Sequence, residues 1–291
     1  SDDELASLLK GKTFMGASDT GGMGGLSKYG IPTPMTADGP AGLRVLPKSG
    51  VRTTAFPVAT MLACTWNTDI LEAVGRAGAL ECKENNVSMW LTPALNIHRN
   101  PLCGRNFEYY SEDPLVSGKM AAAMVRGIQS VGIVATPKHF ACNSQETNRS
   151  KTDSRLSERA LREIYLKGFE LCVKEADPFT IMTSYNKING VWGHYNYNLC
   201  TRLLRKEWGF KGLVMTDWWM QPSKSPEFPK MCNNAYRVRA GVDVLMPGGN
   251  RAGKRKPDKT LLETYNKPQG ITLGEMQHTA KRVVELALKI K

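Results

Sequence analysis

The chain has 291 residues, with 39 Lys and Arg against 27 Asp and Glu, and 41% of its residues are hydrophobic. This composition is typical of a folded globular protein and argues against intrinsic disorder. No run approaches the roughly 18 consecutive apolar residues of a membrane span. The net charge of +12 is spread along the chain, so neither a membrane nor a nucleic acid is expected as a partner.

The seven cysteines and four histidines are scattered, and they lack the CxxC and HExxH spacings of zinc sites. We therefore expect no metal and no organic cofactor. An odd number of dispersed cysteines suits a reducing compartment, so a cytoplasmic location is expected. Because the sequence does not begin with Met, secretion of a longer precursor stays open as the alternative.

Short apolar runs alternate with longer amphipathic segments along the chain. The runs cover residues 34–37, 87–95, 133–136, 179–184, 212–216 and 242–246. Helices are predicted over 67–85, 114–129, 158–175 and from 272 onward. Ser157 is the expected N-cap of the third helix, and Thr272 with Glu275 forms a capping box before the last. Continuous apolar strands that alternate with helices indicate a parallel sheet covered by helices.

The length favours a TIM-type (β/α)8 barrel, which takes about 250 residues, over an open doubly wound sheet. The barrel could be irregular or have a degenerate first unit. Residues 1–291 are predicted to form this single domain, because no linker or shift in composition divides them. The stretch 21–25, Gly-Gly-Met-Gly-Gly, reads as a loop, and it lacks the preceding strand and following helix of a dinucleotide site.

Polar side chains follow the apolar runs at the expected strand ends. They are Asp38 after 34–37, Arg105 and Glu108 beyond 87–97, Lys138 and His139 after 133–137, Tyr185 after 179–184, and Asp217 and Trp218 after 212–216. The carboxyl ends of barrel strands meet at one face, so these side chains should converge. Each has a structural interpretation by itself, such as helix capping or core packing. Together, carboxylates, cations and a Trp face suit a sugar.

The same segments carry a resemblance to a known family. They are residues 31–44 (IPTPMTADGPAGLR), 96–108 (NIHRNPLCGRNFE), 138–140 (KHF), 184–186 (SYN), 212–218 (GLVMTDW) and 241–248 (GVDVLMPG). Over nearly its whole length the chain resembles the N-terminal barrel domain of glycoside hydrolase family 3, the β-glucosidase and β-xylosidase group. Thr216 stands where this family usually has Ser.

The resemblance implies a retaining glycosidase in which Asp217 is the nucleophile and forms a covalent glycosyl-enzyme. The residues implied to line the sugar subsite are Asp38, Arg105, Lys138, His139, Arg149 and Tyr185, with Trp218 in the pocket wall and Met182 beside it or in the core. The cations among them are expected to lower the pKa of Asp217 and keep it ionised. The expected substrate is a β-glucoside or a short β-linked oligosaccharide, cleaved at its terminal non-reducing β-D-glucosyl residue.

A retaining glycosidase needs a second carboxyl group about 5–5.5 Å from the nucleophile as general acid/base. In most of this family a glutamate of a companion α/β-sandwich domain supplies it, and that domain is not present in this chain. The isolated chain is therefore expected to be weakly active. Glu146 is the obvious carboxylate within the chain, but a role in binding or loop structure is preferred for it.

Three alternatives stay open. One is a β-xylosidase of the same family, and another is a non-catalytic carbohydrate-binding barrel. The third is an aldolase that forms a Schiff base through Lys138.

Overall fold

The structure is a computed structural model that describes residues 1–12, 16–220, 224–225, 228–232, 234–248, 260–268 and 270–290. For residues 224–225, 228–232 and 260 it describes the backbone alone.

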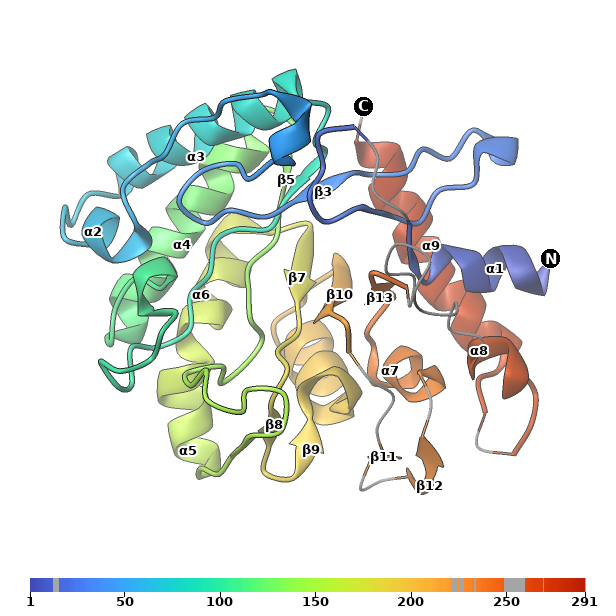
Figure 1. Ribbon diagram of the computed structural model, residues 1–291. Coiled ribbons are helices and arrows are strands. Elements are labelled where there is room, and N and C mark those ends of the chain that lie inside the picture. The colour runs from blue at the N-terminus through green and yellow to red at the C-terminus, as the bar shows by residue number, and fades with distance from the viewer. Residues whose placement is uncertain are drawn as a thin grey trace.

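Two three-stranded parallel sheets form the centre of the fold (Figure 1). The first consists of β3 (Thr36–Ala37), β4 (Met89–Trp90) and β5 (Val134–Ala135). The second consists of β7 (Thr180–Met182), β10 (Leu213–Trp218) and β13 (Val244–Met246). Each of the six predicted apolar runs overlaps one of these strands, so the expectation of a parallel sheet is confirmed.

Single bridges link the two sheets. Phe140 bridges Thr183 in parallel beyond β5 and β7, and Lys10 bridges Leu245 in β13. Lys10 leads into β1 (Gly11–Lys12), which pairs antiparallel with β2 (Gly22–Met23), and Gly22 of β2 bridges Met35. These pairings and single bridges place the strands in the order β1-β2-β3-β4-β5-β7-β10-β13, with Lys10, just before β1, beside β13.

The sequence predicts a TIM-type (β/α)8 barrel, irregular or with a degenerate first unit, and the parallel α/β arrangement is the part of this prediction that is confirmed. Among the described residues the hydrogen-bonded ladders stay separate, and β2 runs antiparallel to both of its neighbours. The reason is local: only the short 3-10 turn η1 (Ser27–Tyr29) lies between β2 and β3, so the chain makes no helical crossover there.

The glycine-rich stretch predicted as a loop is partly a strand, because β2 lies inside it. A Cβ on Gly22 would lie 2.9 Å from the Pro34 carbonyl oxygen and 2.9 Å from the Met35 sulfur. Glycine therefore allows the backbone of β2 to approach its neighbour closely.

The predicted helices form with the expected caps. They are α3 (Thr68–Glu84), α4 (Pro114–Gln129) and α9 (Leu273–Lys289). The capping box of Thr272 and Glu275 is present at α9, and the Ser157 side chain accepts a hydrogen bond from the backbone N–H of Ala160. The segment predicted as one helix over 158–175 is divided into α5 (Glu158–Ala160), the π turn η4 (Leu161–Tyr165) and α6 (Lys167–Ala176).

The structure also contains elements that were not predicted from the sequence. They are α1 (Asp2–Leu8), η2 (Pro47–Ser49), α2 (Ala59–Ala63), η3 (Asn106–Glu108), β6 (Asp153–Ser154), β8 (Lys187–Ile188), β9 (Val191–Trp192), η5 (Gly193–Tyr195), the π-type helix η6 (Asn198–Glu207), β11 (Lys224–Ser225), β12 (Phe228–Cys232), α7 (Ala235–Ala240) and α8 (Thr260–Glu263).

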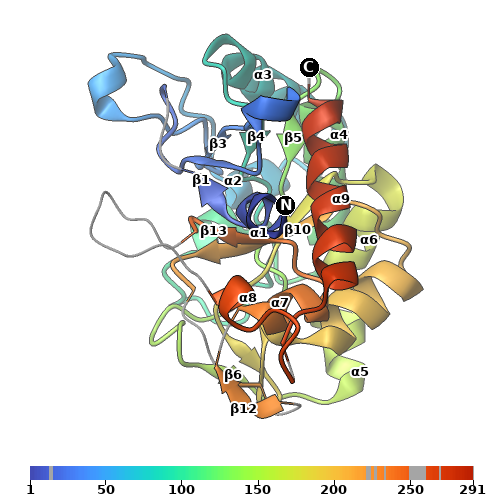
Figure 2. The ribbon, with the colours of Figure 1, turned by 90° about the vertical axis from the view of Figure 1, so that its right-hand side faces the viewer.

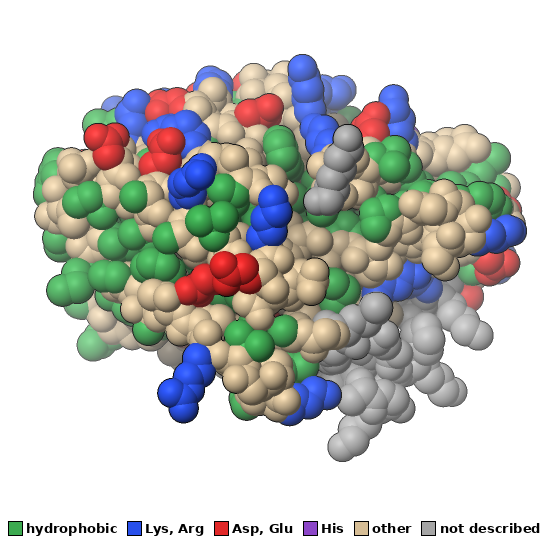
Figure 3. All heavy atoms as spheres, turned by 90° about the horizontal axis from the view of Figure 1, so that it is seen from above, with side chains coloured by type: hydrophobic (Ala, Val, Ile, Leu, Met, Phe, Trp, Pro, Cys, Tyr) green, Lys and Arg blue, Asp and Glu red, His purple; other side chains and the backbone are tan. Residues whose placement is uncertain are grey.

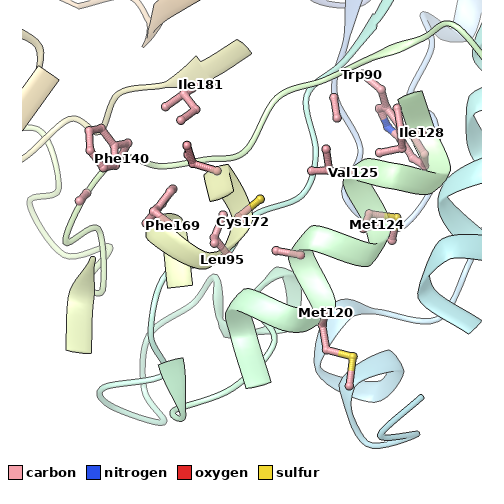
Figure 4. Close-up of a cluster of buried hydrophobic side chains, with 14 of the residues drawn as sticks. Trp90, Leu95, Met120, Met124, Val125, Ile128, Phe140, Phe169, Cys172 and Ile181 are labelled. Atoms are coloured by element: carbon pink, nitrogen blue, oxygen red, sulfur yellow. The ribbon is translucent and has the colours of Figure 1, made fainter. Parts of the chain in front are cut away.

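Side chains alternate along the strands between two buried clusters. Ile181 and Val214 belong to the first cluster, which fills the space between the strands and helices α3, α4 and α6 (Figure 4). Their neighbours Met182 and Met215 belong to the second cluster, which also receives Met276 of α9. Successive side chains of a strand point to opposite faces of the sheet, so this alternation shows that both faces of the strands are buried.

Helices flank the strands on both sides. Helices α3, α4 and α6 cover one side, and α9 with α1 covers the other (Figures 1 and 2). The hairpin β8–β9 follows β7, and β11–β12 follows β10; both lie at the lower edge of Figure 1. This edge therefore holds the carboxyl ends of the central strands.

On the face shown in Figure 3, Lys and Arg side chains are interspersed with Asp and Glu rather than gathered in one basic patch. No helix among the described residues has both the length and the apolar character needed to cross a membrane. Over the same parts of the chain, no group of three or more His, Cys, Asp or Glu side chains is placed to hold a metal ion.

Candidate active site

Side chains from several strand ends meet at the carboxyl edge of the strands. Lys138 follows β5, and its Nζ donates a hydrogen bond of 2.6 Å to Oδ1 of Asp38, which follows β3. His139 Nε2 lies 3.7 Å from Asp217 Oδ2 in β10. The Tyr185 hydroxyl follows β7 and donates to the Trp218 carbonyl oxygen at 2.5 Å. The predicted convergence of these strand ends is therefore present.

Asp38 is held between two cations. Besides Lys138, the Arg44 guanidinium contacts its other carboxylate oxygen at 3.0 Å and also pairs with Asp19. Burial by itself raises the pKa of Asp38, but Lys138 and Arg44 outweigh it and lower the pKa to about 2. Asp38 is therefore a carboxylate at neutral pH, able to accept hydrogen bonds from hydroxyl groups.

Asp217 is a buried carboxyl group, with only 8% of the residue exposed. Its Oδ1 accepts a 2.6 Å hydrogen bond from the backbone N–H of Trp218, whereas Oδ2 has no hydrogen-bond partner among the described residues. Burial raises the pKa of Asp217 above its ordinary value, against the opposing effects of Arg105, Lys138 and Arg149. The expected net lowering is therefore wrong for the free chain: the cations act in the expected direction, but desolvation is stronger.

Arg105 is fixed by two neighbours. Its Nε is paired with the Glu108 carboxylate, and its Nη2 lies 2.9 Å from His139 Nε2. Glu108 is 3% exposed, and a buried carboxylate requires such a cationic partner. Held by Glu108, the Arg105 guanidinium lies close enough to Asp217 for its positive charge to interact with the Asp217 carboxylate.

His139 is a neutral imidazole in this environment. Burial, together with the charges of Arg105, Lys138 and Arg149, holds the pKa of His139 well below its ordinary value. The contact with Asp217 is therefore not an ion pair.

Arg149 reaches the site from the loop after β5. Its guanidinium lies over the Tyr185 ring, 4.6 Å from the centroid, and its Nη1 pairs with Glu146 Oε2 at 3.1 Å. Glu146 thus forms an ion pair within its own loop, which supports the loop-structure role that was one of the two preferred for it. Burial raises the pKa of Tyr185, so its phenol stays protonated at neutral pH.

Trp218 and Met182 differ in their surroundings. The Trp218 indole is partly exposed, and its Nε1 donates to the Thr20 carbonyl oxygen at 3.1 Å. Met182 is 2% exposed and packs in the second cluster. Met182 thus packs in the core, in a cluster against which Trp218 also packs, and its contact with substrate stays a prediction.

Sequence reasoning missed two residues that support the site, Arg44 and Asn96. Asn96 is 1% exposed and makes hydrogen bonds to both the backbone and the ring of His139. Both residues lie inside quoted motifs, Arg44 at the end of 31–44 and Asn96 at the start of 96–108. Their presence inside these motifs was the signal in the sequence, and no local spacing indicates the contacts that they make.

Known proteins resemble the chain closely. Residues 24–286 match the Glycosyl hydrolase family 3 N terminal domain. Beta-glucosidase A of Butyrivibrio fibrisolvens is 59% identical over 75% of this chain and 26% of that protein. Exo-alpha-(1->6)-L-arabinopyranosidase of Bifidobacterium longum is 47% identical over 84% of this chain and 31% of that protein.

A solved structure of beta-glucosidase 3B from Thermotoga neapolitana in complex with alpha-D-glucose superposes with a TM-score of 0.86 and 39% identity. The match covers 99% of this chain and 41% of that one. The chain thus spans between about a quarter and two fifths of the length of these three proteins. The chain belongs to glycosyl hydrolase family 3, and it corresponds to the N-terminal domain of that family.

Proposed function

We propose that this chain carries the nucleophile and the sugar subsite of a retaining β-glucosidase, with Asp217 as the nucleophile. The observation that carries the proposal is the position of Asp217: a buried carboxylate at the end of β10, facing His139 and Arg105, with a cation-bound carboxylate, Asp38, across the same strand edge. The β-glucosidase names of the relatives and the glucose held by the Thermotoga protein support the choice of sugar.

The proposed reaction has two displacements. An Asp217 carboxylate oxygen attacks the anomeric carbon while the bond from that carbon to the leaving-group oxygen breaks, and the leaving oxygen takes a proton from a general acid. Water then attacks the anomeric carbon and gives a proton to the group that acted as the general acid, now its conjugate base, while the bond from the anomeric carbon to Asp217 breaks and the carboxylate is regenerated. Burial raises the pKa of Asp217, and the positive charges of Arg105, Lys138 and Arg149 oppose that increase. These charges therefore favour the reactive, ionised form of Asp217.

The sugar hydroxyls are proposed to bind the polar groups beside Asp217. Asp38 offers acceptors, while Arg105, Lys138 and Arg149 offer donors, and the partly exposed face of Trp218 can stack on a pyranose ring. The Lys138 amine is engaged by the Asp38 carboxylate at 2.6 Å. A Schiff-base aldolase needs a free amine to attack its carbonyl substrate, so this contact disfavours that alternative.

The general acid/base is proposed to come from a part of the relatives' length that this chain does not span. Glu146, the carboxylate considered within the chain, is already paired with Arg149 in its own loop, at 3.1 Å.

The test is intact-mass spectrometry after incubation with a dinitrophenyl 2-deoxy-2-fluoro-β-glucoside. Its leaving group needs little acid assistance, so the measurement does not depend on the general acid. We expect one fluoroglucosyl adduct in the wild type and none in Asp217→Asn. Asp177→Asn is the matched control, because Asp177 is exposed at the opposite end of β7 and its positive φ suits Asn. Sugar binding without an adduct would favour the carbohydrate-binding alternative.

The same experiment ranks the substrates. The corresponding β-xyloside lacks only the hydroxymethyl group, and an α-L-arabinopyranoside is included because one relative carries that name. We expect the glucoside to label fastest. Faster labelling by the xyloside would move the assignment to β-xylosidase.

A further inference from the structure

Asn96 holds His139 by both its backbone and its ring. Its Nδ2 donates to the His139 carbonyl oxygen at 2.9 Å, and its Oδ1 accepts from the His139 backbone N–H at 2.9 Å. A carbonyl oxygen can only accept and a backbone N–H can only donate. These two bonds therefore fix the orientation of the Asn96 amide.

The fixed amide determines which imidazole nitrogen is protonated. The Asn96 atom that lies 3.3 Å from His139 Nδ1 is the oxygen, an acceptor, so Nδ1 must carry the proton. Tyr109 agrees with this assignment: its hydroxyl proton is directed at the Asn143 carbonyl oxygen at 3.2 Å, which leaves its oxygen to accept from Nδ1 at 3.4 Å.

The opposite side of the ring leads to the same conclusion independently. A guanidinium has donors and no acceptor, so Arg105 Nη2, at 2.9 Å from His139 Nε2, must donate to it. Nε2 is therefore the lone-pair nitrogen. Glu108 binds Nε of the same guanidinium, so Arg105 is held by both a carboxylate and an imidazole lone pair.

We propose that Asn96 is a positioning residue that selects the neutral, Nδ1-protonated form of His139, and that this imidazole and Glu108 together fix Arg105 beside Asp217. In this arrangement His139 acts as a hydrogen-bond acceptor for Arg105 and not as a general acid or an imidazolium. The catalytic consequence rests on the proposed function; the protonation state does not.

The charged groups that face the imidazole are consistent with a ring that stays neutral. Arg105, Lys138 and Arg149 all oppose a positive charge on it. Asp217 is the carboxylate near the ring, 3.7 Å from Nε2, and Glu108 acts through Arg105. The His139 side chain is 2% exposed, so water does little to stabilise an imidazolium.

The direct test is side-chain 15N NMR of the wild-type chain between about pH 5 and 8, the range in which an ordinary histidine titrates. The chain has four histidines, and comparison with His139→Gln assigns the relevant signals. We expect a protonated Nδ1 and an unprotonated Nε2 throughout. A protonated Nε2, or titration to an imidazolium near pH 6.5, overturns the proposal without any Asn96 variant.

The Asn96 variants test the cause. Asn96→Asp keeps an acceptor at Nδ1 but adds a carboxylate beside the ring, so we expect His139 to become protonated within this pH range. Asn96→Ala removes the acceptor, so His139 no longer holds Arg105 in its position beside Asp217. We expect adduct formation from the fluoroglucoside to slow about tenfold or more, because small displacements of groups near the reacting atoms reduce the rate strongly. Asn85→Ala is the control, since Asn85 binds the Glu81 carbonyl oxygen at the end of α3.

The two proposals fail separately. If Asn96→Asp or a folded Asn96→Ala leaves the tautomer and the labelling rate unchanged, Asn96 is not the positioning residue. If no protein is labelled at all, the proposed function fails, and the NMR signals still decide the protonation state of His139.

Discussion

The ion pair of Lys138 with Asp38 allows a quantitative test of the electrostatics at the strand edge. The Lys138 side chain is 3% exposed and Asp38 is 23% exposed, so the substitution Lys138→Met leaves a largely buried carboxylate with Arg44 as its remaining cationic partner. Removing one partner of a buried pair costs about 3–5 kcal/mol of unfolding free energy. We expect a loss of this size at pH 7 from urea unfolding followed by Trp fluorescence.

The pH dependence distinguishes this reasoning from a simple packing defect. The pKa of Asp38 falls from 3.8 to about 2 on folding, which corresponds to about 2 kcal/mol of stability. A lowered carboxyl pKa stabilises the fold above pH 3.8, and that stability is lost as the pH falls towards 2. By pH 3 about 1 kcal/mol of it should be gone in the wild type, so the difference between wild type and Lys138→Met should shrink by a similar amount.

The control is Lys119→Met, which removes an exposed pair with Glu175 and should cost about 1 kcal/mol or less. If Lys138→Met lowers the free energy of unfolding by the same amount at pH 7 and at pH 3, the electrostatic account is refuted. If that loss is no larger than the loss in Lys119→Met, the buried pair is not a source of stability.

Further predictions concern the nucleophile, a buried ion cluster and a close helix contact. Because the pKa of Asp217 is raised, labelling by the fluoroglucoside should decline with acid at a pH above 3.8, and Arg105→Gln should move that decline to higher pH. Asp243 is fully buried between two arginines, so the substitution Asp243→Asn should lower the protein's free energy of unfolding by about 3–5 kcal/mol. In Gly78→Ala the new Cβ would lie 2.2 Å from the Trp90 ring, and this overpacking should cost about 1–3 kcal/mol in urea unfolding.

Matched controls make these predictions specific. Gly104→Ala adds a Cβ with no atom within 4 Å, and Glu285→Gln removes an exposed pair with Lys281; both should be close to neutral. A decline of labelling that moves to lower pH in Arg105→Gln would contradict the role given to Arg105. An Asp243→Asn protein as stable as Glu285→Gln would contradict the claim that the ion cluster stabilises the fold. Equal losses of stability in Gly78→Ala and Gly104→Ala would contradict the packing argument.

Local sequence patterns predicted the elements whose stability is local. The capping box at Thr272 and Glu275 requires only residues three apart, and it is present. The apolar runs predicted strands because both faces of a central strand are buried. The meeting of Asp38, Lys138 and Asp217 then followed from topology, since parallel strands end at one edge.

The missed features depend on contacts between distant segments or on balances of opposing effects. The hydrogen bonds of Asn96 to His139 span 43 residues, and no spacing within the chain indicates them. The pKa of Asp217 depends on whether burial or nearby cations dominate, which requires the depth of the side chain. The hairpin β8–β9 did have a local signal, because Asn189-Gly190 is a favoured two-residue turn.

The antiparallel position of β2 was also beyond the sequence patterns. Two-residue strands such as β1 and β2 are too short to show alternation. The bridge from Gly22 to Met35 instead depends on the close backbone approach that glycine allows.

The central claim is that Asp217 is the group that becomes glycosylated. Peptide mapping of the protein labelled by the dinitrophenyl 2-deoxy-2-fluoro-β-glucoside tests it most directly, because fragmentation assigns the added sugar to one side chain. We predict the sugar on Asp217, in the peptide that contains the β10 sequence Leu-Val-Met-Thr-Asp-Trp. A label on Glu146, Asp38 or any other carboxylate would contradict the account.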